Sequence, residues 1–188
     1  MKKKRLAIFD MDGTLFDTKD VNYQAYKEAI IQCGFQNGLD YEYFCECCNG
    51  NHYQKFLPVI LPGISAEQIR RIHEFKKESY VKHLHAAKVH KHLFRVIESI
   101  RPYYQIALAT TASRKNTEDI LHYFQAAEKF DFLVTQEDVS KTKPSPECFL
   151  LAMRLAGVNC ADTMIFEDSK EGIAAASASG AVYFSVHW

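Results

Sequence analysis

Five short apolar segments constrain the fold of this chain more than any other feature of its sequence. They occupy residues 6–9, 104–110, 130–135, 163–166 and 181–186. Continuous apolar runs of this length are typical of strands that are buried on both faces. Strands that alternate with helices along a chain form a parallel sheet with helices on both sides. We therefore predict an α/β fold with a Rossmann-like parallel sheet flanked by helices.

The stretch 19–87 interrupts this alternation, because its hydrophobic pattern is helical throughout. Helical spacing predicts helices over about 19–33, 39–48, 53–61 and 66–85. Ser65 and Gln68 fit a capping box at the start of the last of these helices. We therefore predict an α/β core formed by residues 1–18 and 88–188, with a small all-helical cap inserted at residues 19–87.

The helices of the core are delimited by simple sequence signals. Periodicity and end signals predict helices over about 93–100, 116–124, 146–156 and 170–179. Ser145 is expected to be the N-cap of the third of these helices, with Pro146 at its first helical position. Gly157 is expected to end that helix.

Two carboxylates follow the first apolar segment directly. Asp10 and Asp12 are separated by one residue, so on an extended backbone their side chains would point the same way. Carboxylates next to a buried strand are costly unless a cation compensates their charge. A pair of this kind can share a hard cation such as Mg²⁺. An acidic turn explains an isolated pair equally well, so the interpretation depends on the polar residues downstream.

Those polar residues also follow strands. Thr110 ends the second predicted strand, and Glu167 and Asp168 follow the fourth. Lys143 stands just before a helix, and Pro144 and Pro146, which follow it, make that approach stiff. In a parallel sheet, ligands bind beyond the carboxyl ends of the strands. Carboxylates, a lysine and a hydroxyl at that edge indicate a site for a metal ion and a phosphate. Thr111 competes with Thr110, but strand register favours Thr110.

Four segments together resemble the motifs of the haloacid dehalogenase superfamily. They are Asp10-Met11-Asp12-Gly13-Thr14, the strand that ends in Thr110, Lys143-Pro144-Ser145-Pro146-Glu147 and Glu167-Asp168-Ser169. The resemblance covers residues 6–18 and 104–180, and the ordered combination is specific although each piece alone is weak. It is closest to the phosphatase and phosphomutase branch with a small helical cap, the group around beta-phosphoglucomutase and phosphoglycolate phosphatase.

The resemblance implies roles for four catalytic residues. Asp10 would be the nucleophile that forms an aspartyl phosphate. Asp12 would protonate the leaving alcohol and then deprotonate the attacking water. Thr110 and Lys143 would bind the oxygens of the phosphoryl group that is transferred.

The resemblance also implies Mg²⁺ as the cofactor. Asp10, the backbone carbonyl of Asp12, and Asp168 would bind the ion. Glu167 would act on it through a water molecule. The expected activity is therefore a Mg²⁺-dependent phosphatase acting on a small phosphomonoester, and the expected partner is a small phosphorylated metabolite.

The cap is expected to select the substrate. The break formed by Asn49, Gly50 and Asn51 is the candidate for contacting the leaving group, although an ordinary turn between helices explains it equally well. A sugar-phosphate mutase similar to beta-phosphoglucomutase is the alternative activity. Asn22 and Tyr53 stand where that mutase carries a histidine and an arginine, and this difference favours hydrolysis. The sequence does not identify the substrate.

Charge and hydropathy exclude several classes of partner. Lys and Arg number 23 and so do Asp and Glu, so we expect binding neither to nucleic acid nor to an anionic membrane. No run of 18 apolar residues predicts a membrane-spanning helix. The basic residues 2–5 precede an apolar stretch too short for a signal peptide, so a cytoplasmic location is expected. The chain stops soon after its last strand, without the further helix of many relatives. We expect a monomer or a weak homodimer, with one sheet edge bare or covered by a partner.

Two clusters invite a metal interpretation that we consider weaker than a structural one. The cysteines Cys45, Cys47 and Cys48 lack a second ligand pair that would complete a zinc site, so we expect free thiols. The histidines His83, His85, His90 and His92 are irregularly spaced, and we expect an exposed hinge region there. Glu137 and Asp138 are expected to lie in a solvated loop.

Overall fold

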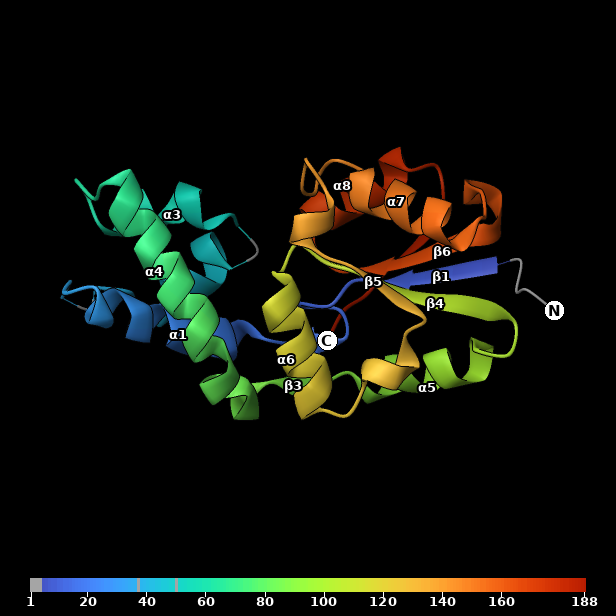
Figure 1. Cartoon of the computed structure of the whole chain (residues 1–188), viewed down its shortest axis with the longest axis horizontal. Coiled ribbons are helices and arrows are strands. Elements are labelled where there is room, and N and C mark those ends of the chain that lie inside the picture. The colour runs from blue at the N-terminus through green and yellow to red at the C-terminus, as the bar shows by residue number, and fades with distance from the viewer. Residues whose placement is uncertain (1–4, 37, 50) are drawn as a thin grey trace. The chain divides into compact units, whose positions relative to one another are not determined.

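The computed structural model describes residues 5–36, 38–49 and 51–188 (Figure 1). Contacts between Cα atoms divide the chain into two compact units. The first, which we call the α/β unit, combines residues 1–17 with 88–188. The second, which we call the helical unit, contains residues 18–87.

The α/β unit is built on a parallel sheet in the strand order β5-β4-β1-β6-β7. The strands are β1 Arg5–Phe9, β4 Tyr104–Ala109, β5 Phe132–Val134, β6 Thr163–Glu167 and β7 Val182–Ser185. The helices are α5 Lys91–Ile100, α6 Arg114–Tyr123, α7 Glu147–Ala156 and α8 Lys170–Ala178. Figure 1 shows α7 and α8 on one face of the sheet, and α5 and α6 on the other. The predicted α/β fold is confirmed.

The strand order places β1 at the point where the chain reverses its direction of winding. β4 and β5 lie on one side of β1, and β6 and β7 lie on the other. The ladder continues past the end of β1, because the Asp10 N–H donates to the Phe166 carbonyl at 3.0 Å. A crevice beyond the carboxyl ends of the strands is expected at such a crossover, and this is where Asp10 lies.

The core between the sheet and α7 and α8 is apolar and closely packed. It contains Leu6 and Ile8 from β1, Ile165 from β6 and Phe149 from α7, all with no exposed surface. Alanines at positions 175 and 176 let α8 approach the strands closely. The sheet therefore offers a rigid base for the side chains that follow its strands.

In the described part of residues 18–87 the regular secondary structure is helical, with turns between the helices. The helices are α1 Lys19–Gln32, α2 Tyr41–Tyr43, a π-helix at Phe44–Cys48, α3 Tyr53–Ile60, α4 Ala66–Ser79 and a 3₁₀-helix at Tyr80–Ala86. The predicted capping box of α4 is confirmed, because Ser65 Oγ accepts from the Gln68 N–H and the Gln68 side chain accepts from the Ser65 N–H. Ile30, Phe44, Leu57 and similar residues form a separate apolar core. Among the helices of the described residues, none combines the length and apolar character needed to cross a membrane.

Two short strands that the sequence did not predict flank the helical unit in the chain. β2 (Phe16–Asp17) pairs antiparallel with β3 (Lys88–Val89). Phe16 is fully buried, with its ring 5.6 Å from that of Phe94 and 5.2 Å from that of Phe124. The pairing ties together the two points at which the chain leaves the α/β unit and returns to it.

The start of α7 corrects one prediction. Pro146 is the N-cap, and Ser145 lies in the preceding turn, where its Oγ is 3.4 Å from the Glu147 nitrogen. With ψ at 2°, Pro146 is not yet helical, so the helix begins one residue later than expected. Gly157 ends α7 as predicted, in a left-handed conformation with φ at 70°. Three 3₁₀ turns complete the unit, at Ala127–Lys129, Gln136–Asp138 and Cys160–Asp162.

Candidate active site

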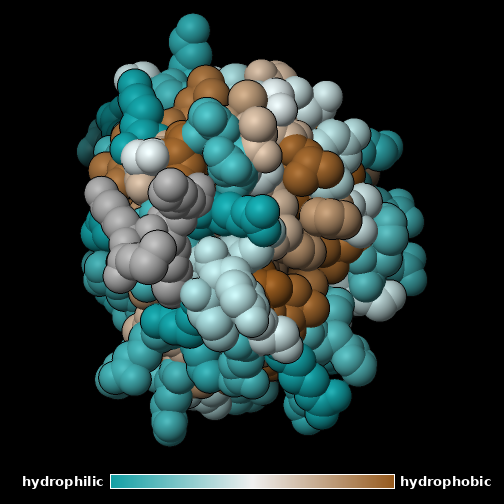
Figure 2. Space-filling model, turned by 90° about the vertical axis from the view of Figure 1, so that its right-hand side faces the viewer, coloured by the Kyte–Doolittle hydropathy of each residue, from teal (hydrophilic) through white to brown (hydrophobic). Residues whose placement is uncertain are grey.

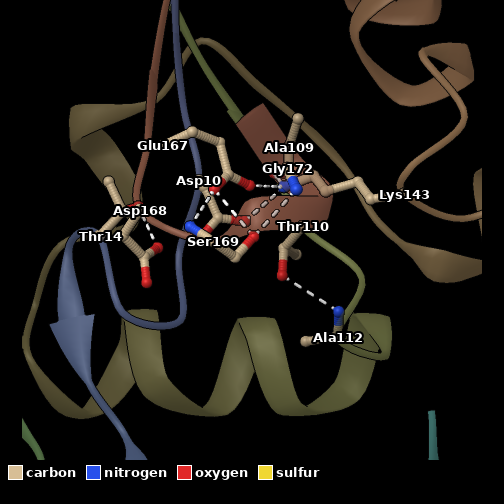
Figure 3. A network of polar contacts seen from close by, with 10 residues as sticks. All are labelled: Asp10, Thr14, Ala109, Thr110, Ala112, Lys143, Glu167, Asp168, Ser169 and Gly172. Atoms are coloured by element: carbon tan, nitrogen blue, oxygen red, sulfur yellow. Dashed lines mark hydrogen bonds and ion pairs between the residues drawn. The ribbon is translucent and has the colours of Figure 1, made fainter. Parts of the chain in front are cut away.

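The ammonium group of Lys143 forms the centre of a buried polar cluster beyond the ends of β1, β4 and β6 (Figure 3). Its Nζ lies 2.5 Å from Asp10 Oδ1, 2.6 Å from Glu167 Oε1 and 3.1 Å from the Ala109 carbonyl oxygen. An ammonium has three N–H donors, and these three contacts use them all. The Lys143 side chain is only 4% exposed, so both ion pairs are shielded from water.

A carboxylate at the start of α7 holds the loop that carries Lys143. Glu147 Oε1 accepts from the Ser140 N–H at 2.7 Å, and its Oε2 accepts from the Lys141 N–H at 3.0 Å. One side chain therefore closes the loop between residues 140 and 147 on itself. Prolines on both sides of Ser145 restrict the loop further, so Lys143 has few alternative directions.

The second oxygen of Glu167 is held by the first turn of α8. Glu167 Oε2 accepts from both the N–H and the Oγ of Ser169, at 2.8 and 3.1 Å. Ser169 is also the N-cap of α8, because its Oγ accepts from the Gly172 N–H at 3.0 Å. A Cβ at Gly172 would lie 1.8 Å from Glu167 Oε1. Glycine is therefore needed for the helix to approach this carboxylate.

Asp168 is positioned by the loop that follows β1. Thr14 Oγ1 donates to Asp168 Oδ1 at 2.7 Å, and Thr14 has no exposed surface. The loop turns at Gly13, whose φ of 90° and close approach to the Asp168 carboxylate both exclude a side chain. The N–H groups of Leu15 and Phe16 both donate to the Met11 carbonyl, which fixes the turn.

The electrostatics of the cluster are dominated by burial. Burial raises the pKa of Asp10 well above its usual value, the nearby charges of Glu167 and Asp168 add to the rise, and Lys143 opposes it. Burial, together with Glu167, raises the pKa of Asp168 to about 6, against the hydrogen bond from Thr14. Burial alone would lower the pKa of Lys143, but Asp10 and Glu167 reverse the effect and raise it. Three carboxylates thus lie near one ammonium, which forms ion pairs with Asp10 and Glu167.

The same carboxylates suit a hard divalent cation. One oxygen each from Asp10, Glu167 and Asp168 lies within 4.8 Å of the others. Carboxylate oxygens are the ligands that Mg²⁺ prefers in proteins. Three carboxylates gathered near a single ammonium carry more negative charge, when ionised, than Lys143 compensates, which a bound cation would relieve. The donor set therefore fits Mg²⁺.

The other two predicted core residues lie at the same edge of the sheet. Thr110 directly follows β4 and is 2% exposed, and its Oγ1 accepts from the Ala112 N–H at 3.0 Å. Thr111 is exposed. Asp12 lies in the loop after β1, partly buried, and forms an isolated bridge with Phe16. The roles suggested for Asp12 and Thr110 remain predictions.

The predicted substrate loop belongs to the helical unit. Asn49 ends the π-helix, and its N–H donates to the Phe44 carbonyl at 2.8 Å. The Asn51 side chain donates to the Cys47 carbonyl at 3.0 Å, a contact expected of an ordinary turn. Gly50 lies outside the described residues. A role of this loop in substrate binding therefore stays a prediction.

The histidines of this cluster contact different parts of the chain. His83 Nε2 lies 2.8 Å from Glu28 Oε2, His85 Nδ1 lies 3.1 Å from the Lys82 carbonyl oxygen, and His90 caps α5. His85 and His92 are exposed, but His83 and His90 are only partly exposed, so the expected exposed hinge is wrong for those two residues.

Glu137 and Asp138 are exposed, as expected, and they lie in the 3₁₀ turn Gln136–Asp138, where both make specific contacts. Glu137 accepts from the Arg114 N–H at 2.9 Å, and Asp138 accepts from the Arg114 guanidinium at 2.6 Å. Asp138 also accepts from the Thr135 N–H and hydroxyl. Together they anchor the start of α6 to the end of β5.

Sequence reasoning assigned no function to Thr14, Glu147 or Ser169, although all three lie within the recognised motifs. Each orients a charged residue of the cluster through a hydrogen bond or by closing a loop. The sequence signal that could have identified Thr14, Glu147 and Ser169 is that each lies in a motif close to the charged residue that it orients.

The chain is similar to several known proteins. A family model described as haloacid dehalogenase-like hydrolase matches residues 7–186. A phosphorylated carbohydrates phosphatase of Thermotoga maritima is 28% identical, covering 96% of this chain and 84% of its own length. The fructose-1-phosphate phosphatase YqaB of Escherichia coli is 28% identical, covering 92% of this chain and 91% of its own. The crystal structure of CbbY from Rhodobacter sphaeroides in complex with phosphate is 26% identical with a TM-score of 0.85, covering 98% of this chain and 86% of that one.

Proposed function

Because the chain belongs to the haloacid dehalogenase-like hydrolase family, we propose that it is a Mg²⁺-dependent phosphatase of small phosphorylated carbohydrates. The observation that carries this proposal is the buried cluster of Asp10, Lys143, Glu167 and Asp168 beyond the strand ends. Such a cluster suits phosphoryl transfer, in which positioning and charge neutralisation supply most of the rate.

The reaction that we propose has two steps, both at phosphorus. An oxygen of the Asp10 carboxylate attacks the phosphorus, the ester P–O bond breaks, and Asp12 gives its proton to the departing sugar oxygen. Water then attacks the phosphorus of the aspartyl phosphate, Asp12 accepts a proton from this water, and the bond to Asp10 breaks. Inorganic phosphate leaves, and both aspartates return to their starting forms.

The surrounding charges prepare Asp10 for this role. A nucleophilic carboxylate must be ionised, yet burial raises the pKa of Asp10. Lys143, 2.5 Å away, favours the ionised form and directs one lone pair of the carboxylate. When bound by Asp10, Asp168 and the Asp12 carbonyl, Mg²⁺ would supply further positive charge next to the phosphate oxygens. Thr110 and Lys143 would then hold those oxygens in place, with Lys143 giving up one of its three present contacts to do so.

The names of two relatives support a sugar phosphate as substrate, since one is a phosphorylated carbohydrates phosphatase and the other a fructose-1-phosphate phosphatase. We further propose that residues 1–18 and 88–188 form the catalytic core and that residues 19–87 form a cap that selects the leaving group. The loop Asn49–Asn51 is the candidate for that contact.

Phosphate release from a panel of sugar, nucleotide and glycolate phosphates, measured with and without Mg²⁺, tests the proposal. We expect release from at least one sugar phosphate, dependent on Mg²⁺ and abolished in Asp10→Asn. Asp119→Asn is the matched control, because Asp119 forms only a surface ion pair with Lys115 and should leave turnover unchanged. Isomerised sugar phosphate without phosphate release would instead identify a mutase and overturn the proposal.

A further inference from the structure

Strand β7 forms one edge of the sheet, and its apolar side chains are exposed. Val182, Tyr183 and Phe184 are 60%, 40% and 47% exposed. The strand reads Val-Tyr-Phe-Ser and contains neither a charged residue nor a proline. Natural edge strands usually carry charges, proline or a bulge that prevents them from pairing with another chain. β7 lacks the first two of these safeguards.

The exposed apolar surface extends to the end of the α/β unit at which the strands begin. Figure 2 views this end and shows apolar side chains in brown gathered on one side, among hydrophilic ones in teal. Val182, at the start of β7, is 60% exposed. Contiguous apolar surface of this kind often marks a site of protein association.

The backbone of β7 has unused hydrogen-bonding groups on its outer side. The Val186 N–H donates to the Glu167 carbonyl at 2.8 Å, so the peptide groups of Val186 face β6. Peptide groups alternate in direction along a strand, so those of Phe184 also face β6. Tyr183 and Ser185 therefore direct their N–H and C=O groups away from the sheet, where another strand can pair with them.

A row of stacked aromatic rings leads from the centre of the sheet to this edge. The Phe9 and Phe166 rings are 4.5 Å apart and nearly parallel, and the Phe166 and Phe184 rings are 5.1 Å apart. Phe9 has no exposed surface, whereas Phe184 is 47% exposed. The row thus ends in an aromatic ring against which a further apolar side chain can pack.

We propose that β7 pairs antiparallel with β7 of a second copy of this chain, about a two-fold axis next to Phe184. A two-fold interface requires a patch that is complementary to itself. An uncharged strand with free peptide groups and a terminal aromatic ring meets this requirement, because pairing brings no like charges together. The two sheets then join into one, and the aromatic row continues across the axis. This inference does not depend on the proposed function.

The free peptide groups select the register. With the axis at Phe184, Tyr183 pairs with Ser185 of the second copy, and all outward-facing groups of β7 are satisfied. An axis at Tyr183 would need the Ala181 N–H, which already donates to Ser179 Oγ at 3.3 Å. An axis at Ser185 would need His187, which lies beyond the end of β7. The Phe184 register therefore uses the strand most completely.

The mass of the full chain in solution, measured by sedimentation over about a hundredfold range of concentration, is the first test. We expect a dimer that dissociates on dilution. Tyr183→Pro should shift the dissociation constant upward by tenfold or more, because proline removes an outward N–H and leaves the bonds to β6 intact. Tyr183→Thr, which keeps the N–H and suits a strand, is the matched control and should remain dimeric. Circular dichroism confirms that both variants fold.

Disulfide trapping tests the register. The exposed Cys47 and Cys160 are first replaced by serine. Phe184→Cys should then form a disulfide-linked dimer on oxidation, because facing residues at a non-hydrogen-bonded pair have Cα atoms about 4.5 Å apart. Val182→Cys should not, because its partner is residue 186 of the second copy. A monomer at every concentration, a dimer unaffected by Tyr183→Pro, or equal trapping at positions 182 and 184 would overturn the proposal.

Discussion

Asp168 is held in buried surroundings that disfavour its negative charge. The free energy of unfolding lost to this buried charge can therefore be measured separately from the proposed role of Asp168 in binding metal. Burial raises its pKa to about 6, from an ordinary value of 3.8. Because the folded state binds this proton more tightly than the unfolded chain does, stability falls as pH rises from about 4 to about 6 and does not recover above that.

We therefore expect Asp168→Asn to be more stable than the unaltered protein at pH 8 without metal. The gain should be on the order of 2 kcal/mol, and it should vanish near pH 4. The amide oxygen can still accept from Thr14, so the local structure should persist. Thermal melts over this pH range measure the effect, with the exposed Asp162→Asn as control. A variant that melts below the unaltered protein at pH 8 would contradict the argument, and phosphatase activity should be lost in either case.

Glu147 leads to a second prediction at this scale, because its carboxylate closes the loop that carries Lys143. Glu147→Ala leaves two N–H groups without their acceptor, so we expect a loss of stability of about 1–2 kcal/mol. We also expect kcat/KM to fall about tenfold, since small displacements of a positioning group are costly. Glu147→Gln keeps one acceptor oxygen, so its stability and its kcat/KM should lie between those of Glu147→Ala and those of the unaltered protein. Equal kinetics for all three proteins would show that the loop needs no such closure.

Helix α8 carries a glycine, Gly172, at a position where helix propensity alone would favour alanine. Replacing glycine by alanine within a helix usually stabilises it by about 1 kcal/mol. At Gly172 the added Cβ would lie 1.8 Å from Glu167 Oε1, so one of the two must move. Displacing Glu167 would separate it from Lys143, whose Nζ lies 2.6 Å away.

We expect Gly172→Ala to lower the melting temperature and to reduce kcat at least tenfold, against the usual helix preference. Gly38→Ala is the control, because a Cβ there meets nothing within 4 Å. Melting curves and phosphate release measure both effects. A Gly172→Ala protein that is fully active would mean that α8 can shift without disturbing Glu167.

The elements of the α/β unit could be predicted from sequence where hydrophobic pattern alone determines them. β1 and β6 are apolar runs between polar residues, and such runs have few alternatives to a buried strand. β2 and β3 could not be found, because two residues have no periodicity and their pairing joins positions far apart in the chain. The start of α7 was misplaced because Ser145 and Pro146 form a strong local signal that the turn before the helix overrides.

At the scale of the whole molecule, the gathering of the candidate site residues could be predicted because parallel strands bring their carboxyl ends to one edge. Asp10 and Asp168 are far apart in sequence but follow neighbouring strands, so topology alone brings them together. The partners of each charge could not be predicted. Whether Lys143 faces Glu167 depends on the closure of a loop by Glu147, and no local pattern encodes that closure.

The chain as a whole is electrically balanced, with 23 basic and 23 acidic residues, so weak binding of cations over its surface should be small. The buried carboxylates are the exception, and their raised pKa values couple metal binding to pH. A carboxyl group must lose its proton before it can bind Mg²⁺, so affinity should fall as pH drops through about 6, where Asp168 becomes protonated.

We therefore expect Mg²⁺ to raise the melting temperature strongly at pH 8 and much less at pH 5. A concentration about 100 times the dissociation constant adds about 2.7 kcal/mol of stability. Each pH unit below 6 should remove about 1.4 kcal/mol of this gain for one competing proton, until the gain is exhausted. Melts at both pH values with and without Mg²⁺ measure the difference, and Asp168→Asn should show little shift at either. An equal shift at both pH values would place the ion on groups that are already ionised, away from Asp10 and Asp168.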